Sequence, residues 1–268
     1  MKTNVYSLEG KVLKQIALPS LFENAVRNDL IKRAVLSDES KLYQPKGSYK
    51  FAGLETSAKY RGRKEMYGAI KNKGIPHLPH EVQPKGQFGK VKRVPHAVKG
   101  RRAHPPKPEK QLVEAMNQKE YQKAVISALS ASAHTELVQS RSSVKTDISF
   151  PIVLDGKFEH LKKTKEVVLL FDLLHLSKLV SKSKENGTSG PLVILATDVP
   201  ALRSARNIAG VDTVLVSKLT VKHLAPGCKP GRVVIFTEKS LEAVEKSLKN
   251  FESFAKRAHG IEKSMQAK

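Results

Sequence analysis

The C-terminal half of the chain alternates short runs of consecutive apolar residues with longer amphipathic stretches. The apolar runs predict four buried strands, at residues 149–154, 192–196, 213–216 and 233–236. The other stretches predict helices, at residues 160–182, from Asp198 as N-cap through Pro200 to Gly210, and beyond Thr237. Apolar strands separated by helices are typical of a parallel sheet covered on both faces. We therefore expect an α/β domain of three layers with a mostly parallel sheet.

The N-terminal region predicts a hairpin followed by a helix. Apolar runs at residues 5–8 and 12–18 flank a Glu-Gly turn, which is the pattern of two paired strands. Ser20 and Glu23 have the spacing of a capping box, in which two side chains bond the first free amides of a helix. We therefore expect a helix at residues 24–37.

Two further helices are predicted from apolar stripes. Residues 109–133 contain neither Gly nor Pro, and they predict one long helix with a stripe of Leu112, Met116, Ala124, Ala128 and Leu129. The helix beyond Thr237 is expected to place on one face Leu241, Val244, Leu248 and Phe251. Both stripes are of the kind that a helix buries against a core.

The segment from residue 41 to residue 108, which we call the basic segment, breaks this pattern. It contains 17 Lys and Arg against 3 Asp and Glu, 8 of the 14 prolines and 8 of the 16 glycines. Pro lacks an amide donor and Gly is costly to order, so neither a helix nor a central strand is expected. Ordering these residues costs roughly 70–130 kcal/mol of backbone entropy, which so few apolar side chains cannot offset. We expect a long extended loop without regular structure, ordered on a partner and inserted into one globular domain of residues 1–40 and 109–268.

The net charge of the chain points to a polyanionic partner. There are 48 Lys and Arg against 25 Asp and Glu, a net charge of +23, and the basic segment supplies +14 of it. Because such self-repulsion costs stability, nucleic acid or an anionic membrane is the expected partner. A membrane fits poorly, because residues 1–14 lack the apolar run of a signal peptide and the most apolar stretch, residues 167–174, is too short to span a bilayer.

Side-chain types in the basic segment favour RNA contact over a solvated linker. Five of its basic residues are Arg, which is suited to bidentate contact with phosphate. Its aromatic residues, which offer faces that stack on unpaired bases, are Tyr43, Tyr49, Phe51, Tyr60, Tyr67 and Phe88. A spacer has no use for these rings, so we interpret the basic segment as an RNA-binding arm.

The sequence gives no support to enzyme chemistry. Neither G-x-G-x-x-G nor G-x-x-x-x-G-K-[ST], which cradle the phosphates of nucleotides, occurs in the chain. His77 and His80 have a spacing seen in metal sites, but neighbouring prolines prevent the helix that would align them. Cys228, as the single cysteine, excludes an internal disulfide. We expect no enzyme, cofactor, metal or small-molecule substrate. Two alternatives to a structural RNA-binding protein remain open: an RNA-modifying enzyme, and an architectural protein that binds nucleic acid generally.

One run within the basic segment carries a family resemblance. Residues 98–107 read VKGRRAHPPK, which resembles the G-R-R-x-H-P-P-K stretch of the large-ribosomal-subunit protein family numbered four, in its archaeal branch. Other pieces agree in order. NVYSLEG at residues 4–10 resembles the opening strand and turn of the family, and residues 27–35 resemble its first helix. Residues 44–47, 52–53 and 56–58 resemble the start of the family's loop.

The resemblance implies a structural protein of the large ribosomal subunit. Family members have an α/β body on the outer side of the subunit, which contacts rRNA near its 5′ end early in assembly. Their long loop enters the rRNA, and its tip helps to line the polypeptide exit tunnel. The implied partners are large-subunit rRNA, other large-subunit ribosomal proteins and the nascent polypeptide, and the implied location is the ribosome in the cytoplasm.

On this chain the implied loop runs inward over residues 43–60, turns between residues 61 and 87, and returns over residues 91–107. The residues expected to bind rRNA are Lys46, Lys50, Tyr60, Arg61, Arg63, Lys64, Lys71, Lys73, Lys85, Lys90, Lys92, Arg93, Lys99, Arg101, Arg102, His104 and Lys107. The residues expected at the tunnel tip are Arg63, Tyr67, Lys71, His77 and His80.

Overall fold

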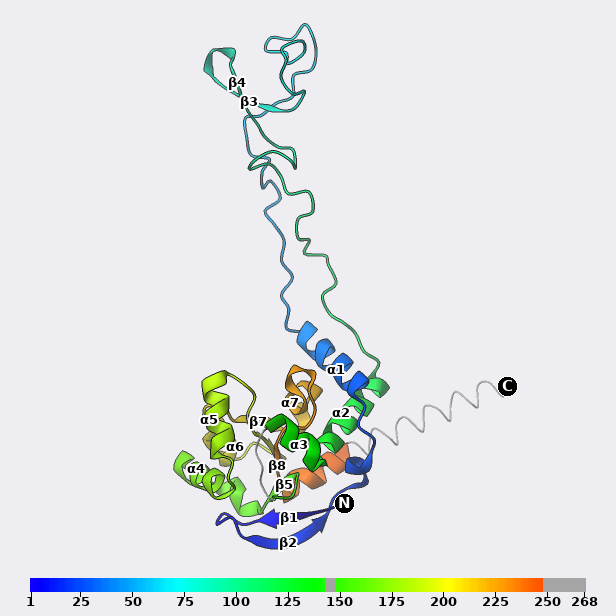
Figure 1. The fold of residues 1–268 in the computed structure, drawn as a ribbon, viewed down its shortest axis with the longest axis vertical. Coiled ribbons are helices and arrows are strands. Elements are labelled where there is room, and N and C mark those ends of the chain that lie inside the picture. The colour runs from blue at the N-terminus through cyan, green and yellow to red at the C-terminus, as the bar shows by residue number, and fades with distance from the viewer. Residues whose placement is uncertain (143–147, 248–268) are drawn as a thin grey trace, which may run out of the picture. The chain divides into compact units, whose positions relative to one another are not determined.

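A computed structural model describes residues 1–142 and 148–247 of the chain. The chain forms two compact units. The first, which we call the body, comprises Met1–Leu42 and Val113–Lys268, and the second, the insert unit, comprises Tyr43–Leu112. The body contains a six-stranded sheet with helices around it, and the insert unit contains a two-stranded sheet (Figure 1). Among the described residues, no helix has the length and apolar character needed to cross a bilayer.

The sheet of the body is mixed but mostly parallel. Its strands lie in the order β2-β1-β5-β8-β6-β7. β1 and β2 form the predicted antiparallel hairpin at one edge, and every other neighbouring pair is parallel. The strands are β1 Lys2–Tyr6, β2 Val12–Ala17, β5 Ile152–Leu154, β6 Leu192–Leu195, β7 Asp212–Leu215 and β8 Val234–Thr237. The prediction of an α/β fold with a mostly parallel sheet is confirmed.

Helices cover both faces of this sheet, because successive strand residues enter two different hydrophobic clusters. Val234 and Phe236 of β8 belong to the first cluster, and Ile235 belongs to the second. Helices that contribute to the first cluster are α1 (Asn28–Ser40), α2 (Gln118–Ala133), α7 (Val221–Leu224) and the helical residues 238–247. Helices that contribute to the second are α3 (Thr135–Ser142), α4 (Thr164–Leu173), α5 (Ser177–Asn186) and α6 (Pro200–Arg206). Each cluster removes one face of the sheet from water, which produces three layers.

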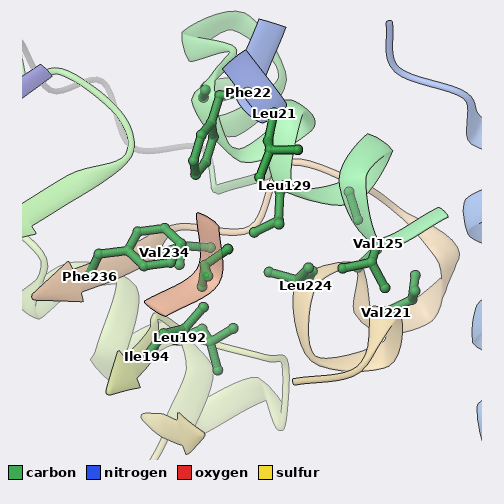
Figure 2. Close-up of a cluster of buried hydrophobic side chains, with 14 of the residues drawn as sticks. Leu21, Phe22, Val125, Leu129, Leu192, Ile194, Val221, Leu224, Val234 and Phe236 are labelled. Atoms are coloured by element: carbon green, nitrogen blue, oxygen red, sulfur yellow. The ribbon is translucent and has the colours of Figure 1, made fainter. Parts of the chain in front are cut away.

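Large side chains tie the first cluster to the sheet (Figure 2). The ring of Phe22 meets the ring of Phe236 edge to face, with ring centroids 6.0 Å apart. Leu129 of α2 and Leu192 of β6 belong to the same cluster and are fully buried. The N-terminal segment, α2 and the centre of the sheet therefore share one core.

The prediction that Ser20 and Glu23 cap a helix is wrong. Both residues belong to a 3-10 turn, η1 (Ser20–Glu23), which buries Leu21 and Phe22. The first helix, α1, begins only at Asn28 and has no side-chain cap. Burying two large apolar side chains contributes more free energy than one capping box, so the core decides the path of the chain here.

The long helix predicted at residues 109–133 is wrong in its first part, since α2 begins at Gln118. Ser37 of α1 donates its hydroxyl to the carbonyl of Glu114 at 2.6 Å, and the amide of Glu114 donates to the hydroxyl of Ser40 at 2.9 Å. These hydrogen bonds satisfy the backbone of Glu114 without a helical turn. Contacts with α1 therefore override the local helix propensity.

The helix predicted at residues 160–182 is divided into α4 and α5. The chain turns between them at His175, which has a φ of +54°. On either side of this turn, Leu174 and Leu176 are each only 1% exposed. The inward turn gives the second cluster two leucines that one straight helix could not place there.

The ends of two other helices also differ from the prediction. Val199, and not Asp198, occupies the N-cap of α6, while Pro200 stands in its first turn as predicted. Gly210, which has a φ of +90°, follows this helix after a short gap. Leu248 and Phe251, predicted on one face of the last helix, lie outside the described residues.

Candidate nucleic-acid interface

The insert unit contains two extended arms that lie side by side (Figure 1). Gly47 of the first arm approaches Pro108 of the second so closely that a Cβ at Gly47 would lie 3.0 Å from the proline ring. Gly53 has a φ of +73°, and a Cβ there would lie 2.5 Å from the carbonyl oxygen of Gly100. Only glycine combines this conformation with such a close approach. The glycines therefore let the two arms run together backbone to backbone.

Beyond the arms the insert unit forms a small hairpin. β3 (His80–Val82) and β4 (Phe88–Val91) pair antiparallel, and Lys59 adds an isolated bridge to the first residue of β3. Ala58 and Ile70 are buried in this part of the chain. The expectation of a loop without regular structure is wrong at this point. A few buried side chains and a tight turn are enough to pair two strands of three and four residues.

His80 is buried within this hairpin, with only 8% of its surface exposed. Its Nδ1 lies 3.0 Å from the carbonyl oxygen of Gly89, and its Nε2 lies 3.0 Å from that of Pro76. The ring also meets Phe88 edge to face, with centroids 5.9 Å apart. The prediction that His80 lies at the tunnel tip is not supported by these contacts, because a ring held in this way presents neither nitrogen to an outside partner. His80 instead connects β3, β4 and the segment before them.

Replacing His80 by Leu is expected to open the hairpin. The change removes the imidazole from the carbonyls of Pro76 and Gly89, at a cost of about 1–3 kcal/mol for buried polar groups. The amide of Lys59, which donates to the carbonyl of His80, reports the opening through its hydrogen exchange. Its exchange is expected to become about 10-fold faster or more. The matched change His77→Leu alters an exposed histidine and should leave this rate unchanged; equal rates in both variants would contradict the assignment.

Most basic side chains of the insert unit are exposed, and none of those that the structure describes forms an ion pair with a carboxylate. Every ion pair found among the described residues lies in the body. Of the residues predicted to bind rRNA, only Arg61 and Lys92 are half-buried. The exposed ones are Lys46, Lys50, Tyr60, Arg63, Lys64, Lys71, Lys73, Lys85, Lys90, Arg93, Lys99, Arg101, Arg102, His104 and Lys107. Positive charge that no carboxylate neutralises is available to a polyanion.

Aromatic side chains of the insert unit are also exposed. Tyr67 is 81% exposed and Tyr43 is 62% exposed. Tyr49 and Phe51 meet edge to face with centroids 5.9 Å apart, and the Tyr49 hydroxyl donates to the carboxylate of Glu55 at 2.6 Å. This hydrogen bond raises the pKa of Tyr49 above its ordinary value. Exposed rings are suited to stacking on unpaired bases.

Four of the predicted rRNA-binding residues converge on one hollow of the insert unit. Its volume is about 910 Å³, and its basic lining residues include Lys46, Arg102, His104 and Lys107. Glu109 also lines it. The two arms thus bring residues from opposite ends of the segment into one basic surface.

The other tip residues differ from His80 in being accessible. Arg63, Tyr67, Lys71 and His77 are all exposed in the segment before β3. Within the part of the chain that the structure describes, no three His, Cys, Asp or Glu side chains gather in a way that would hold a metal ion.

These observations define an α/β protein with a long, exposed, basic insertion. The family model described as "Ribosomal protein L4/L1 family" matches residues 16–247 of the chain. A protein of Methanocaldococcus jannaschii named "Large ribosomal subunit protein uL4" is 40% identical over 262 residues, which cover 91% of this chain and 98% of that protein. The protein of the same name from Methanospirillum hungatei is 39% identical over 252 residues, with 89% and 96% covered. The chain therefore belongs to the ribosomal protein L4/L1 family.

Family membership confirms the resemblance to the archaeal branch. A member of this family is a structural protein of the large ribosomal subunit, which is a cytoplasmic ribonucleoprotein that carries out translation. The prediction that the chain is not an enzyme is confirmed, because its relatives are ribosomal proteins. The alternatives of an RNA-modifying enzyme and of a non-ribosomal architectural protein are set aside on the same ground.

Proposed function

We propose that this chain binds large-subunit rRNA chiefly through its insert unit. The observation that carries the proposal is the unneutralised charge of that unit. The basic segment has a net charge of +14, and among the described residues only Lys41, at its start, forms an ion pair, with Asp38 of the body. Lys and Arg that contact phosphate release the counterions condensed on RNA, and this release drives binding.

Different side chains of the insert unit contribute in different ways. Arg101 and Arg102 are exposed and suited to bidentate contact with phosphate oxygens. Tyr49 and Tyr67 offer rings for stacking on bases that are not paired. The close approach at Gly53 keeps the two arms narrow, so that both can lie between RNA segments.

The tip of the insert unit is proposed to help line the polypeptide exit tunnel. The support is the family resemblance together with the exposure of Arg63, Tyr67, Lys71 and His77. On this proposal the nascent polypeptide passes these side chains. The body is proposed to contact rRNA near its 5′ end, early in assembly, and to meet other ribosomal proteins of the large subunit.

Photo-crosslinking in assembled ribosomes tests both parts of the proposal. A photoreactive phenylalanine is placed at Tyr49, at Tyr67 or, as a control, at Leu169, an exposed residue of α4 in the body. We expect crosslinks to large-subunit rRNA from Tyr49, and crosslinks to a stalled nascent chain from Tyr67 alone. Absence of rRNA crosslinks from Tyr49 would overturn rRNA binding by the insert unit. Nascent-chain crosslinks no stronger from Tyr67 than from Leu169 would overturn the tunnel assignment.

A further inference from the structure

The body carries a second basic hollow, at the amino ends of β6 and β8. Its volume is about 280 Å³. The charged residues that line it are all basic: Arg141 of α3, Lys182 of α5, and Lys229 and Arg232 from the segment before β8. The lining is completed by polar and small residues that include Ser142, Thr188, Ser189, Gly190 and Gly231. None of these residues lies in the insert unit.

Arg232 is the buried member of this lining, with 2% of its surface exposed. Its Nε donates to the carbonyl of Gly190 at 2.7 Å, and its Nη1 donates to the carbonyl of His223 at 2.7 Å. Its Nη2 donates to the carboxylate of Asp212. Burial lowers the pKa of Arg232, and the hydrogen bond and charge of Asp212 oppose that effect. Among the described residues, Asp212 is the only carboxylate with which Arg232 forms an ion pair, and the guanidinium of Arg232 already engages it.

Arg141 places a second guanidinium group at the hollow, and no described carboxylate forms an ion pair with it. Its Nη2 donates to the carbonyl of Pro226 at 2.9 Å, and its Nη1 donates to the carbonyl of Lys229. No ion pair within residues 1–142 and 148–247 includes it. Burial, and then repulsion from Arg232, lower the pKa of Arg141 to about 10. A bound anion would relieve this repulsion between two partly desolvated cations.

Two glycines hold the chain tightly around the hollow. A Cβ at Gly190 would collide with the carbonyl oxygen of Gly210. Gly231 has a φ of +86°, and a Cβ there would lie 2.6 Å from the carbonyl oxygen of Leu137. A side chain at either position would force neighbouring backbone segments apart. The basic groups are thus placed by the packed backbone and not by flexible side chains alone.

We propose that this hollow binds a phosphate group of the RNA backbone and gives the body an anchor of its own. Phosphate suits the lining, because the two guanidinium groups place positive charge beside it and the exposed Lys182 and Lys229 offer ammonium groups as donors to its oxygens. This assignment rests on the rRNA binding proposed above and adds a second set of contacts, separate in sequence from the insert unit.

The full chain carrying Lys182→Gln and Lys229→Gln tests the assignment. The control carries Lys162→Gln and Lys165→Gln, which remove the same charge from exposed positions of the body outside the hollow. Binding of large-subunit rRNA is measured over a salt series. For the hollow variant the slope of log K against log salt is expected to become shallower by about 1 for each lysine, with about a 10-fold loss of affinity. The control should keep the wild-type slope.

Thermal unfolding in inorganic phosphate, compared with chloride at equal ionic strength, gives a second measurement. Phosphate is expected to raise the Tm of the wild type and of the control, but not of the hollow variant. If this happens while both variants bind rRNA alike, the hollow takes free phosphate and the RNA anchor is overturned. No phosphate effect together with equal rRNA binding overturns the site itself. A wild-type chain that fails to bind rRNA overturns the proposed function instead, and the phosphate measurement still reports on the hollow.

Discussion

Replacing residues 43–107 by a short Gly/Ser linker is expected to remove most of the affinity of the chain for large-subunit rRNA. The change deletes 16 of the 48 Lys and Arg but only 3 of the 25 Asp and Glu. If about half of the 17 basic groups of the basic segment contact phosphate, the intact chain should show a slope of log K against log salt of roughly −6 to −7. The replaced chain should bind about 10³-fold more weakly at physiological salt, with a slope near −2 from the body.

A control variant of unchanged length distinguishes the effect of losing charge from the effect of shortening the chain. It keeps every Gly, Pro and aromatic residue of residues 43–107 and places Gln at the 16 basic positions. Since counterion release needs charge and not length, its slope should match that of the linker variant. Far-UV circular dichroism confirms that the helices of the body remain folded in both variants. Wild-type affinity and slope in the linker variant would mean that the body carries the binding, contrary to the proposal.

The sheet of the body is predictable because its signal is local. β6 (Leu192–Leu195) consists of four consecutive buried apolar residues, a pattern that arises when both faces of a strand are covered. The errors lie where a distant segment decides the backbone. Ser37 and Ser40 of α1 form hydrogen bonds with the backbone of Glu114. The sequence of residues 109–117 contains no signal that predicts these bonds. The same holds for His80, whose burial depends on the carbonyl of Gly89 across the turn.

The two basic surfaces differ in the same way. The exposed charge of the insert unit is predictable because one segment supplies an excess of +14 that too few local acids neutralise. The hollow of the body is assembled from Arg141, Lys182, Lys229 and Arg232, which belong to separate segments and stand among residues of ordinary composition. Only the packing of α3 and α5 beside β8 brings these cations together. Composition therefore predicts the basic surface of the insert unit, whose residues are close together in the sequence. It does not predict the hollow of the body, whose residues are brought together only by the fold.

The body should be sensitive to changes in its first cluster, and Leu129→Ala is expected to lower its free energy of unfolding by about 2–5 kcal/mol. Leu129 of α2 is fully buried in the cluster that also contains Leu21, Phe22 and Phe236 (Figure 2). Truncation removes apolar contacts and leaves a cavity that the surrounding backbone cannot close completely. Because domains are commonly stable by about 5–15 kcal/mol, the loss is a large fraction of the total. Urea unfolding followed by far-UV circular dichroism measures it, since the described α-helices all lie in the body.

Leu169→Ala is the matched control, because it removes the same atoms from a helix of the same body. Leu169 of α4 is 62% exposed, so its truncation should change the free energy of unfolding by no more than about 0.5 kcal/mol. Equal losses in the two variants would contradict the packing of α2 in the first cluster. While it remains folded, the Leu129→Ala chain should keep the wild-type salt slope for rRNA, because every basic group is retained. A change in slope would show that rRNA binding depends on the core as well as on the charge of the insert unit.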